Sequence, residues 1–232
     1  MFLGPYTAIP PTVTPRWTRT SAAPALAVDL DTVKVFTNRP VEDTFFDAEL
    51  TTFIRVATAE IEKECQLSLT PGQFRVTLPA FADRINLTRF RPFVSVDAIE
   101  YVDPDTGEIT AVSSSLYHAL PVDQECGMVF LGDGLAWPTA ANRHDAVRLT
   151  VKAGFAADED DVAAGYPEMP YEVTHALLMT IAALDMARGD TQASPGANVT
   201  VYAMKNSKGG SLIPQEAKTL LRNWTYRWIT VG

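Results

Sequence analysis

Residues 43–67 have the sequence DTFFDAELTTFIRVATAEIEKECQL, which predicts an amphipathic helix. Apolar side chains recur at spacings of three and four and form one stripe: Phe46, Leu50, Phe53, Ile54, Ala57, Ile61 and Cys65. The opposite face is polar, and Asp43 or Thr44 is placed to cap the first turn. Because such a stripe has to be covered, we expect a core around this helix, with Cys65 as a buried apolar side chain rather than a reactive thiol.

The pattern changes after this helix, and residues 71–153 contain runs in which apolar and polar positions alternate. A slip in the alternation at Asp97-Ala98 predicts a β-bulge within one run. Turn sequences separate the runs, and we interpret Asp103–Glu108 as a hairpin turn. The segment is therefore predicted to form an antiparallel sheet or small barrel of about five to seven strands.

Two further helices are predicted beyond the strands. The first spans residues 170–189, where Pro170 suits the first turn and Gly189 suits the end. The second spans residues 213–230 and again places apolar side chains on one face. An acidic loop, Asp158–Asp161, precedes both helices.

Together these elements predict an α+β fold. The three helices form one core, and the β segment is a long insertion between the first and the second helix. Residues 1–32 are rich in proline, which removes backbone donors, so we expect an extended arm without regular secondary structure. This arm is expected to lie on a surface of its own chain or of a neighbour, while residues 33–232 form a single domain.

The 232-residue chain is 47% hydrophobic and has a formal net charge of −9. Residues 1–39 and 200–232 are mildly basic, so the middle of the chain is strongly acidic. This balance argues against general nucleic-acid affinity and favours a solvated acidic surface, the alternative being complementary charge that steers subunits together. No apolar stretch reaches the roughly 18–20 residues of a membrane span. The first residues lack a secretory signal, so we expect synthesis in the cytoplasm with reduced thiols.

The sequence contains no recognisable catalytic or metal-binding motif. The three histidines, His118, His144 and His175, have no other His or Cys three or four positions away. His118 and Cys126 could approach each other across a turn, but a metal ion would lack two further ligands. Asp103–Glu108 matches only the opening of a calcium loop, because no glutamate follows at the required position. We therefore predict no catalytic residue, no metal ion and no cofactor.

A series of short motifs, each unspecific alone, follows one another between residues 33 and 228. In chain order they are Val41-Glu-Asp-Thr-Phe-Phe-Asp-Ala-Glu-Leu, Phe74-Arg-Val-Thr-Leu-Pro, Phe90-Arg-Pro-Phe-Val-Ser-Val-Asp-Ala-Ile-Glu-Tyr-Val-Asp, Gly134-Leu-Ala-Trp-Pro, Val147-Arg-Leu-Thr-Val-Lys-Ala-Gly-Phe, Met169-Pro-Tyr-Glu-Val and Leu212-Ile-Pro-Gln-Glu-Ala-Lys-Thr-Leu-Leu-Arg. Their order resembles that of the head–tail connector (adaptor or head-completion) proteins of long-tailed phages and of phage-like gene transfer agents.

The resemblance implies a structural role without a catalytic residue. Proteins of this family form a ring, typically a dodecamer, under the portal of the DNA-filled head. The ring extends the DNA channel and carries the next head-completion (stopper) or tail protein. The implied partners are therefore the portal protein, that next protein and neighbouring copies, while DNA passes without sequence specificity. The implied location is the head–tail interface of the virion, after synthesis in the cytoplasm of the bacterial host.

Within this role we assign two sets of residues as hypotheses. An acidic channel wall lets packaged DNA slide, because phosphate contacts to basic side chains would hold it. The hypothetical channel face consists of Glu60, Glu62, Glu64, Asp158, Glu159, Asp160 and Asp161. The hypothetical portal-binding surface lies on the last helix and consists of Lys218, Arg222, Tyr226 and Trp228.

Two other interpretations stay open at this point. A monomeric, β-rich accessory binding module of a phage tail or baseplate would have the same strand content. An unrecognised hydrolase would need a Cys/His pair, for which His118 and Cys126 are the candidates.

Overall fold

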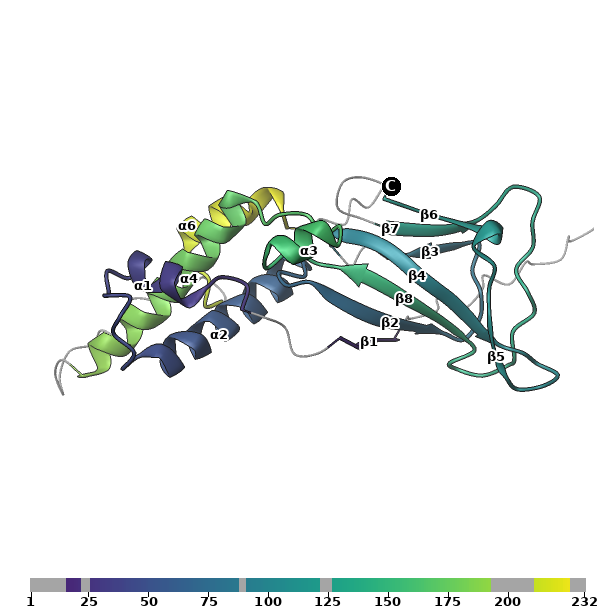
Figure 1. Ribbon diagram of the computed structural model, residues 1–232, viewed down its shortest axis with the longest axis horizontal. Coiled ribbons are helices and arrows are strands. Elements are labelled where there is room, and N and C mark those ends of the chain that lie inside the picture. Colours follow the sequence, from purple (N-terminus) through teal and green to yellow (C-terminus); the bar gives the residue numbers. More distant parts are fainter. Residues whose placement is uncertain (1–15, 22–25, 88–90, 122–126, 193–210, 226–232) are drawn as a thin grey trace, which may run out of the picture.

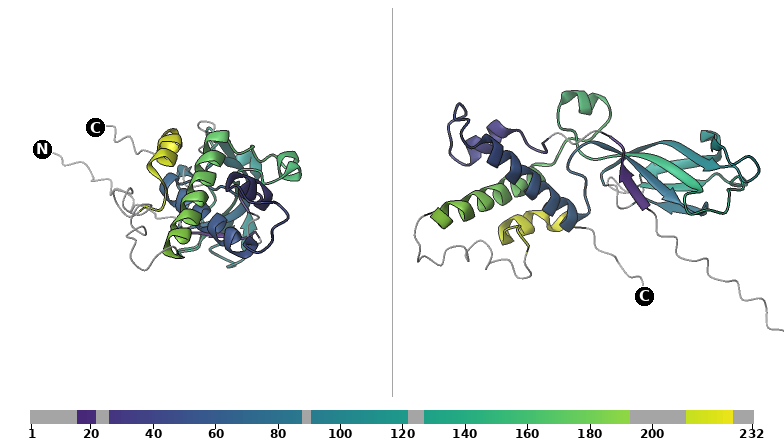
Figure 2. Two further views of the ribbon diagram at one scale, coloured as in Figure 1. Left: turned by 90° about the vertical axis from the view of Figure 1, so that its left-hand side faces the viewer. Right: turned by 90° about the horizontal axis from the view of Figure 1, so that it is seen from below.

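The structure is a computed structural model that describes residues 16–21, 26–87, 91–121, 127–192 and 211–225. The molecule is elongated, with helices at one end and strands at the other (Figure 1). Each end has its own cluster of buried apolar side chains. The views in Figure 2 show the two ends meeting in line, with a short helix, α3 (Glu159–Ala163), projecting beside the place where they meet. The predicted α+β class is confirmed.

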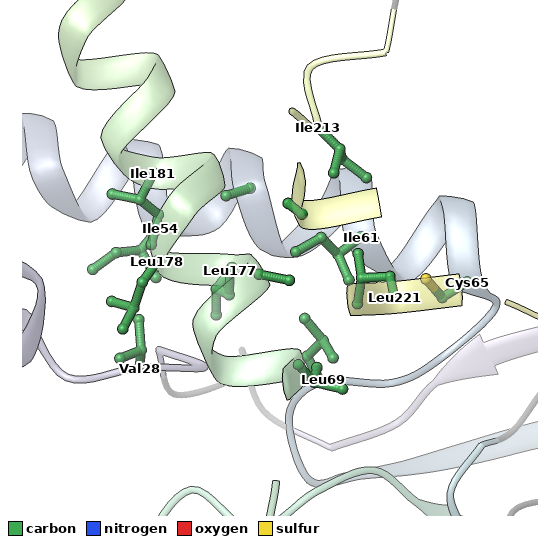
Figure 3. Packing of buried hydrophobic residues seen from close by; sticks show 14 of the residues in the cluster. Val28, Ile54, Ile61, Cys65, Leu69, Leu177, Leu178, Ile181, Ile213 and Leu221 are labelled. Carbon is green, nitrogen blue, oxygen red and sulfur yellow. The ribbon is translucent and has the colours of Figure 1, made fainter. Parts of the chain in front are cut away.

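Four of the described helices form the helical end. They are α1 (Leu30–Phe36), α2 (Asp47–Cys65), α4 (Tyr171–Gln192) and α6 (Gln215–Leu220), which continues into a 3-10 turn at Leu221–Asn223. Helix α4 contacts both α2 and α6, so the predicted three-helix core is present. Side chains from all three helices are buried between them, among them Ile54, Ile61, Leu177, Ile181 and Leu221 (Figure 3).

Helix α2 confirms the predicted stripe but begins later than predicted, at Asp47. Neither Asp43 nor Thr44 caps it, because Asp43 accepts a hydrogen bond of 3.0 Å from the backbone N–H of Phe45 in the preceding turn. The last residue of the helix, Cys65, is fully buried in the core, as the stripe predicts.

The other two helix boundaries also differ from the prediction. Helix α4 continues through Gly189 to Gln192, because Gly189 stays helical instead of adopting the left-handed conformation of a C-cap. The predicted helix over 213–230 is shorter in the described residues, because α-helical geometry gives way to the tighter 3-10 turn at Leu221. Residues 226–230 of that prediction lie outside the described residues.

The described strands form two antiparallel sheets. The five-stranded sheet has the order β1-β2-β8-β4-β5, with bounds Arg16–Arg19, Gly72–Leu78, Val147–Ala153, Phe93–Val102 and Ile109–Ala111. The three-stranded sheet has the order β3-β7-β6, with bounds Arg84–Asn86, Gly127–Leu131 and Tyr117–Pro121, and a 3-10 turn at Ser114–Leu116 leads into it. Their inner faces enclose the second apolar cluster, so the described strands form a sandwich and not a closed barrel.

The alternation of apolar residues predicts the inner face of this sandwich correctly. Strand β8 buries every second residue, including Val147, Leu149 and Val151. The register of β4 against β8 shifts between Val96 and Ala98, which confirms the predicted bulge. A sheet bent by such a bulge twists more strongly at that point.

The predicted hairpin turn joins β4 to β5. The carboxylate of Asp103 accepts hydrogen bonds from the backbone N–H groups of Asp105 and Thr106, at 2.9 and 3.0 Å. These bonds lower the pKa of Asp103 below its usual range. Gly107 closes the turn with φ of +74°, a conformation that favours glycine. The acidic sequence therefore makes a turn, as interpreted above.

The prediction of an arm without regular secondary structure is wrong at Arg16–Arg19, which forms strand β1. This strand pairs antiparallel with β2, from Arg16 opposite Thr77 to Arg19 opposite Phe74. It lies at the edge of the sheet, where flanking prolines cost no hydrogen bonds of the ladder. Residues 1–15 of the predicted arm lie outside the described residues.

Candidate functional site

The helical end and the sandwich meet at a junction. After passing from β1 to α1, the chain passes between the helical end and the sandwich twice more, and we call these two later passages the first and the second crossing of the junction. Residues 66–71 lead from α2 into β2, and Gly154 follows β8 on the way back. Gly154 has φ of +119°, and a Cβ at this position would collide with the carbonyl oxygen of Thr70. Its N–H donates to the carbonyl of Pro92 at 2.9 Å. The two crossings therefore lie in direct contact at a position that only glycine fits.

Glu62 connects α2 to the first crossing. Its carboxylate accepts a hydrogen bond of 2.8 Å from the backbone N–H of Leu69. Burial raises the pKa of Glu62, and the hydrogen bond from Leu69 and the positive charge of Arg19 oppose that shift. This glutamate therefore stabilises the junction from the helical side.

Arg19 connects β1 to the same crossing. Its guanidinium donates to the hydroxyl oxygens of Ser21 and Thr70, at 3.0 and 3.3 Å, and to the carbonyl of Pro71. It also lies 5.5 Å from the ring centre of Phe74, within range of a cation–π contact. The arginine occupies space that the missing side chain of Gly72 leaves open, since a Cβ there would lie 2.9 Å from the Arg19 guanidinium carbon.

Arg91 is the third polar connection and is almost fully buried. Its guanidinium donates to the carbonyl of Cys65 at the end of α2 and to the carbonyl of Trp224 after the last 3-10 turn, at 3.4 and 3.3 Å. Its own carbonyl accepts from the N–H of Ser68 at 2.6 Å. One side chain from the sandwich thus satisfies the ends of two helical segments.

A groove of about 480 Å³ opens beside this junction, in the angle between α2 and the β1–β2 edge. Its lining consists of Trp17, Arg19, Ala59, Glu62, Lys63, Gln66, Leu67, Ser68 and Phe74. Trp17 packs edge-to-face on Phe74, with ring centres 6.1 Å apart, and remains 42% exposed. The Lys63 side chain at the rim is 80% exposed. The groove therefore has an aromatic wall that solvent reaches.

The predicted channel-facing residues fall into two separate groups. Glu60, Glu62 and Glu64 lie on the last turns of α2, where Glu64 is exposed, Glu60 is half-buried and Glu62 is engaged in the junction. The second group, Asp158–Asp161, forms the start of α3 rather than a loop. In that group Asp158 accepts from the N–H of Asp161 at 2.9 Å, and Asp161 accepts from the N–H of Ala157 at 3.0 Å.

The predicted portal-binding residues are only partly described. Lys218 is half-buried on α6, and Arg222 is exposed in the following 3-10 turn. Tyr226 and Trp228 lie outside the described residues. The described part therefore places two basic side chains at the C-terminal side of the helical end.

The histidines lie in three different environments. His118 is exposed on β6, with its ring centre 5.6 Å from that of Phe130. His175 on α4 packs edge-to-face with Phe36, with ring centres 5.7 Å apart, and His144 lies in the loop before β8. Cys126 lies outside the described residues. Among the residues that are described, no three His, Cys, Asp or Glu side chains gather as metal ligands would.

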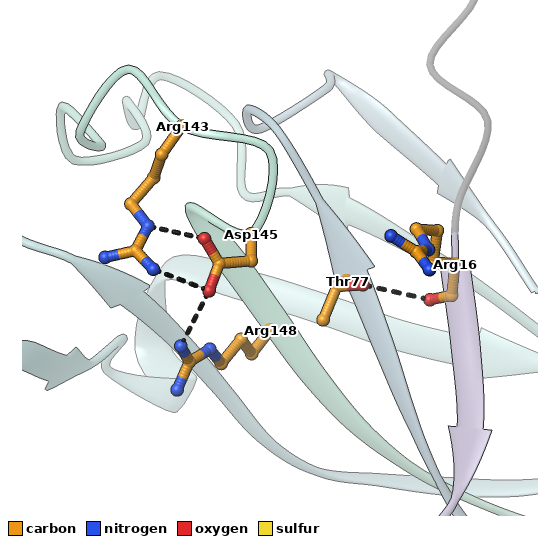
Figure 4. Close-up of polar contacts among 5 residues, drawn as sticks. All are labelled: Arg16, Thr77, Arg143, Asp145 and Arg148. Atoms are coloured by element: carbon orange, nitrogen blue, oxygen red, sulfur yellow. Dashed lines mark hydrogen bonds and ion pairs between the residues drawn. The ribbon is translucent and has the colours of Figure 1, made fainter.

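The outer face of the five-stranded sheet is polar and carries its own ion-pair cluster (Figure 4). Asp145 lies between Arg143 and Arg148, and its hydrogen bonds with these two arginines lower its pKa to about 2. Nearby, the hydroxyl of Thr77 donates to the carbonyl of Arg16 at 3.3 Å, which adds a bond between β2 and the edge strand. These contacts hold the sheet together and leave no recognisable binding geometry in the residues drawn.

Comparison with known proteins gives matches of structure only. No family model matches the chain, and no curated protein matches its sequence. The fold is similar to a chain in the neck of an empty gene transfer agent (GTA) particle computed with C6 symmetry, with a TM-score of 0.65 and 21% identity over 94% of this chain and 98% of that chain.

Two further solved structures are similar to the same extent. A chain in the virion of a native GTA particle gives a TM-score of 0.62 with 20% identity, over 93% of this chain and 98% of that one. A chain in the neck of a native GTA particle computed with C12 symmetry gives a TM-score of 0.61 with 21% identity, over 94% and 98%. At such identities the likeness shows a common fold, which extends over nearly the whole length of each chain. In the described residues no helix is both long enough and apolar enough to cross a lipid bilayer.

Proposed function

We propose that this protein is a structural head–tail connector subunit in the neck of a phage-like particle. The observation that supports the proposal is the likeness of fold to chains of GTA particles, two of them described as neck, which covers nearly the full length on both sides. In this proposal the protein is part of the virion, is made in the bacterial host cytoplasm and acts without catalysis.

The proposed assembly is a ring under the portal, with twelve copies as the expected number. The C6 and C12 symmetries of the similar neck structures favour cyclic arrangements of this kind. In a closed ring each subunit meets its neighbours through two different surfaces. The ring would extend the DNA channel and carry the next head-completion or tail protein.

Two exposed acidic stretches support the proposed channel face. Glu64 on α2 and Asp158–Asp160 around the start of α3 are exposed, and no hydrogen bond or ion pair among the described residues joins them to a basic side chain. Carboxylates facing DNA repel phosphates and prevent the contacts that would hold the DNA. In the proposal Glu60, Glu62, Asp161 and these residues form the channel face, with Glu62 serving the junction as well.

The proposed portal-binding surface consists of Lys218, Arg222, Tyr226 and Trp228. This assignment is tested by the charge reversal Lys218→Glu/Arg222→Glu. The measured quantity is the binding of the variant to emptied, tail-less heads that carry a portal. A matched control reverses Arg55 and Arg75, two exposed basic side chains on α2 and β2. The proposal requires that the first variant loses binding and the control does not; equal binding of both variants would remove this assignment.

The experiment for the role as a whole is co-sedimentation with emptied, tail-less heads that carry a portal, followed by electron microscopy. Added density in a symmetric ring at the portal vertex is the expected result, and it gives the copy number. If the folded protein fails to bind, the connector role is wrong. The accessory binding module of a tail or baseplate then becomes the function to test.

A further inference from the structure

Two charged side chains in the walls of the groove are already engaged, while Lys63 lies at the rim, 3.9 Å from Glu60. Arg19 donates to Ser21, Thr70 and Pro71, and the carboxylate of Glu62 accepts from Leu69. A charged ligand that paired with Arg19 or Glu62 would therefore compete with bonds that hold the junction together. What the groove offers instead is the exposed ring of Trp17, supported edge-to-face by Phe74. These features suit an uncharged, apolar segment.

The chain contains such a segment directly before the groove. Residues 1–15, MFLGPYTAIPPTVTP, have no charged side chain, although 20% of the whole chain is charged. They include four prolines, together with Phe2, Leu3, Tyr6 and Ile9. Exposed apolar side chains that lie close together mark sites of interaction. Proline-rich segments adopt the polyproline II conformation readily and pack on aromatic rings without needing backbone hydrogen bonds.

We infer that residues 1–15 of one copy bind in the groove of a neighbouring copy. This inference rests on the proposed function, because it requires copies placed side by side. It assigns to the groove a ligand of stated chemistry, an uncharged proline-rich segment, and it makes the arm a link between subunits. Copies held side by side in a ring would give each arm a high effective concentration at the neighbouring groove.

The direction of β1 favours a neighbour over the same chain. Arg19, at the end of β1, lies at the junction, whereas Arg16 lies opposite Thr77, toward the far end of β2. The arm therefore continues from the Arg16 end of the strand and not from the Arg19 end, which lies at the junction. A return to the groove of the same chain would require the arm to reverse its direction, and Pro15 disfavours a helical turn at the residue before it.

The experiment uses full-length protein and a photo-crosslinker. Unlabelled protein with Tyr6→p-benzoylphenylalanine is mixed with 15N-labelled protein without the crosslinker, both on portal-bearing heads and free at roughly millimolar concentration. After irradiation, mass spectrometry identifies the linked peptides. The expected product joins an unlabelled arm to labelled groove residues, in 59–68 or 16–19.

Filling the groove provides the specificity control. Ala59→Trp in the labelled partner places an indole in the groove, and we expect the yield of labelled–unlabelled product to fall about tenfold or more, the equivalent of a loss of about 1.4 kcal/mol. Ala48→Trp, at an exposed position on the same helix, should leave the yield unchanged. Equal melting temperatures of the two variants show that folding is not the cause.

The outcomes separate this inference from the proposed function. Rings on heads with crosslinks outside the groove, or with arm and groove from the same copy only, overturn the inference and leave the connector role intact. Labelled–unlabelled groove products in free protein, without binding to heads, support the arm–groove contact and overturn the connector role. Absence of any groove product in both samples overturns the inference.

Discussion

The helical end and the sandwich are stabilised by apolar cores, whereas the junction between them is stabilised by polar side chains. Ile61 and Leu149 are fully buried, one in each core. Between the cores, Glu62, Arg19 and Arg91 make directional bonds to backbone groups of the crossings and helix ends. Apolar packing does not depend on a particular direction of contact, whereas a hydrogen bond weakens when its donor and acceptor are misaligned. The cores therefore provide stability, and the junction fixes how the two ends are oriented.

The largest effects are expected in the two cores. Ile61→Ala and Leu149→Ala should each lower the free energy of unfolding by about 2–5 kcal/mol, because each leaves a cavity. Since the junction couples the two ends, we expect one calorimetric transition in the unsubstituted protein and in both variants. Two transitions, with each variant shifting only one of them, would show that the ends unfold independently.

The next effect is expected at Gly154. Gly154→Ala should cost about 1–3 kcal/mol from backbone strain, and the collision with the Thr70 carbonyl adds to this. Gly107→Ala is the matched control, because Gly107 also has positive φ but a Cβ there would meet nothing within 4 Å. Chemical denaturation of both variants measures the difference. Equal losses would mean that the two crossings have room to move apart.

Removal of Arg91 tests the polar connections. Arg91→Leu leaves the carbonyls of Cys65 and Trp224 without this donor, and we expect a loss of about 1–3 kcal/mol. Arg75→Leu, at an exposed position, should change the free energy of unfolding by less than about 0.5 kcal/mol. If both variants are equally stable, the junction owes its stability to packing and not to these bonds.

A smaller, pH-dependent effect is expected at Glu62. Because its pKa is raised in the folded protein, the ionised form is disfavoured there, and the unfolded chain ionises first, near the ordinary value of 4.5. As pH rises above 4.5 and through the raised pKa of Glu62 in the folded protein, the unsubstituted protein should therefore lose stability relative to the Glu62→Gln variant. Unfolding free energies of both proteins between pH 4 and 8 measure this loss, and parallel curves would contradict it.

The smallest effect is expected on the outer face of the sheet. Asp145 has a pKa of about 2 in the folded protein against 3.8 ordinarily, so its stabilising contribution exists above pH 3.8 and disappears as pH falls to about 2. The Asp145 side chain is half-buried at the surface of the sheet, so salt should screen part of the contribution. Melting temperatures of the unsubstituted protein and of Asp145→Asn, at low and high salt, should converge under acid or salt. A difference in melting temperature that stayed constant under acid and salt would contradict a stabilising role of the Asp145 charge.

Periodicity in the sequence is sufficient to predict the helical core and the inner face of the sandwich. The apolar stripe on α2 and the alternation in β8 each predict which side chains are buried. They do so because the spacing of apolar residues follows the face of the helix or strand that packs against the core. The sequence also predicts the bulge in β4, since one extra residue shifts the alternation of apolar and polar positions. The sequence does not predict strand β1, because four residues next to prolines are too few to show an alternation.

The junction could not be predicted because it depends on contacts between distant residues. Arg19 reaches Pro71 and Arg91 reaches Trp224, and no local pattern marks either arginine. The same holds for Lys34, which is 3% exposed and pairs with Asp47 at 2.7 Å. Glu62 looked like its neighbours on a polar helix face, and only the position of Leu69 distinguishes it.

The insertion of the sandwich between α2 and α4 has a consequence for the order of synthesis. Strand β8 ends at Ala153, so every strand of the sandwich has been made before α4 begins at Tyr171. Helix α2, made earlier, needs α4 and α6 to cover its apolar stripe. On the ribosome the sandwich can therefore form while α2 still exposes Leu50, Ile54 and Ile61. Until α4 and α6 are made, the apolar stripe of α2 is therefore the part of the helical end most exposed to aggregation.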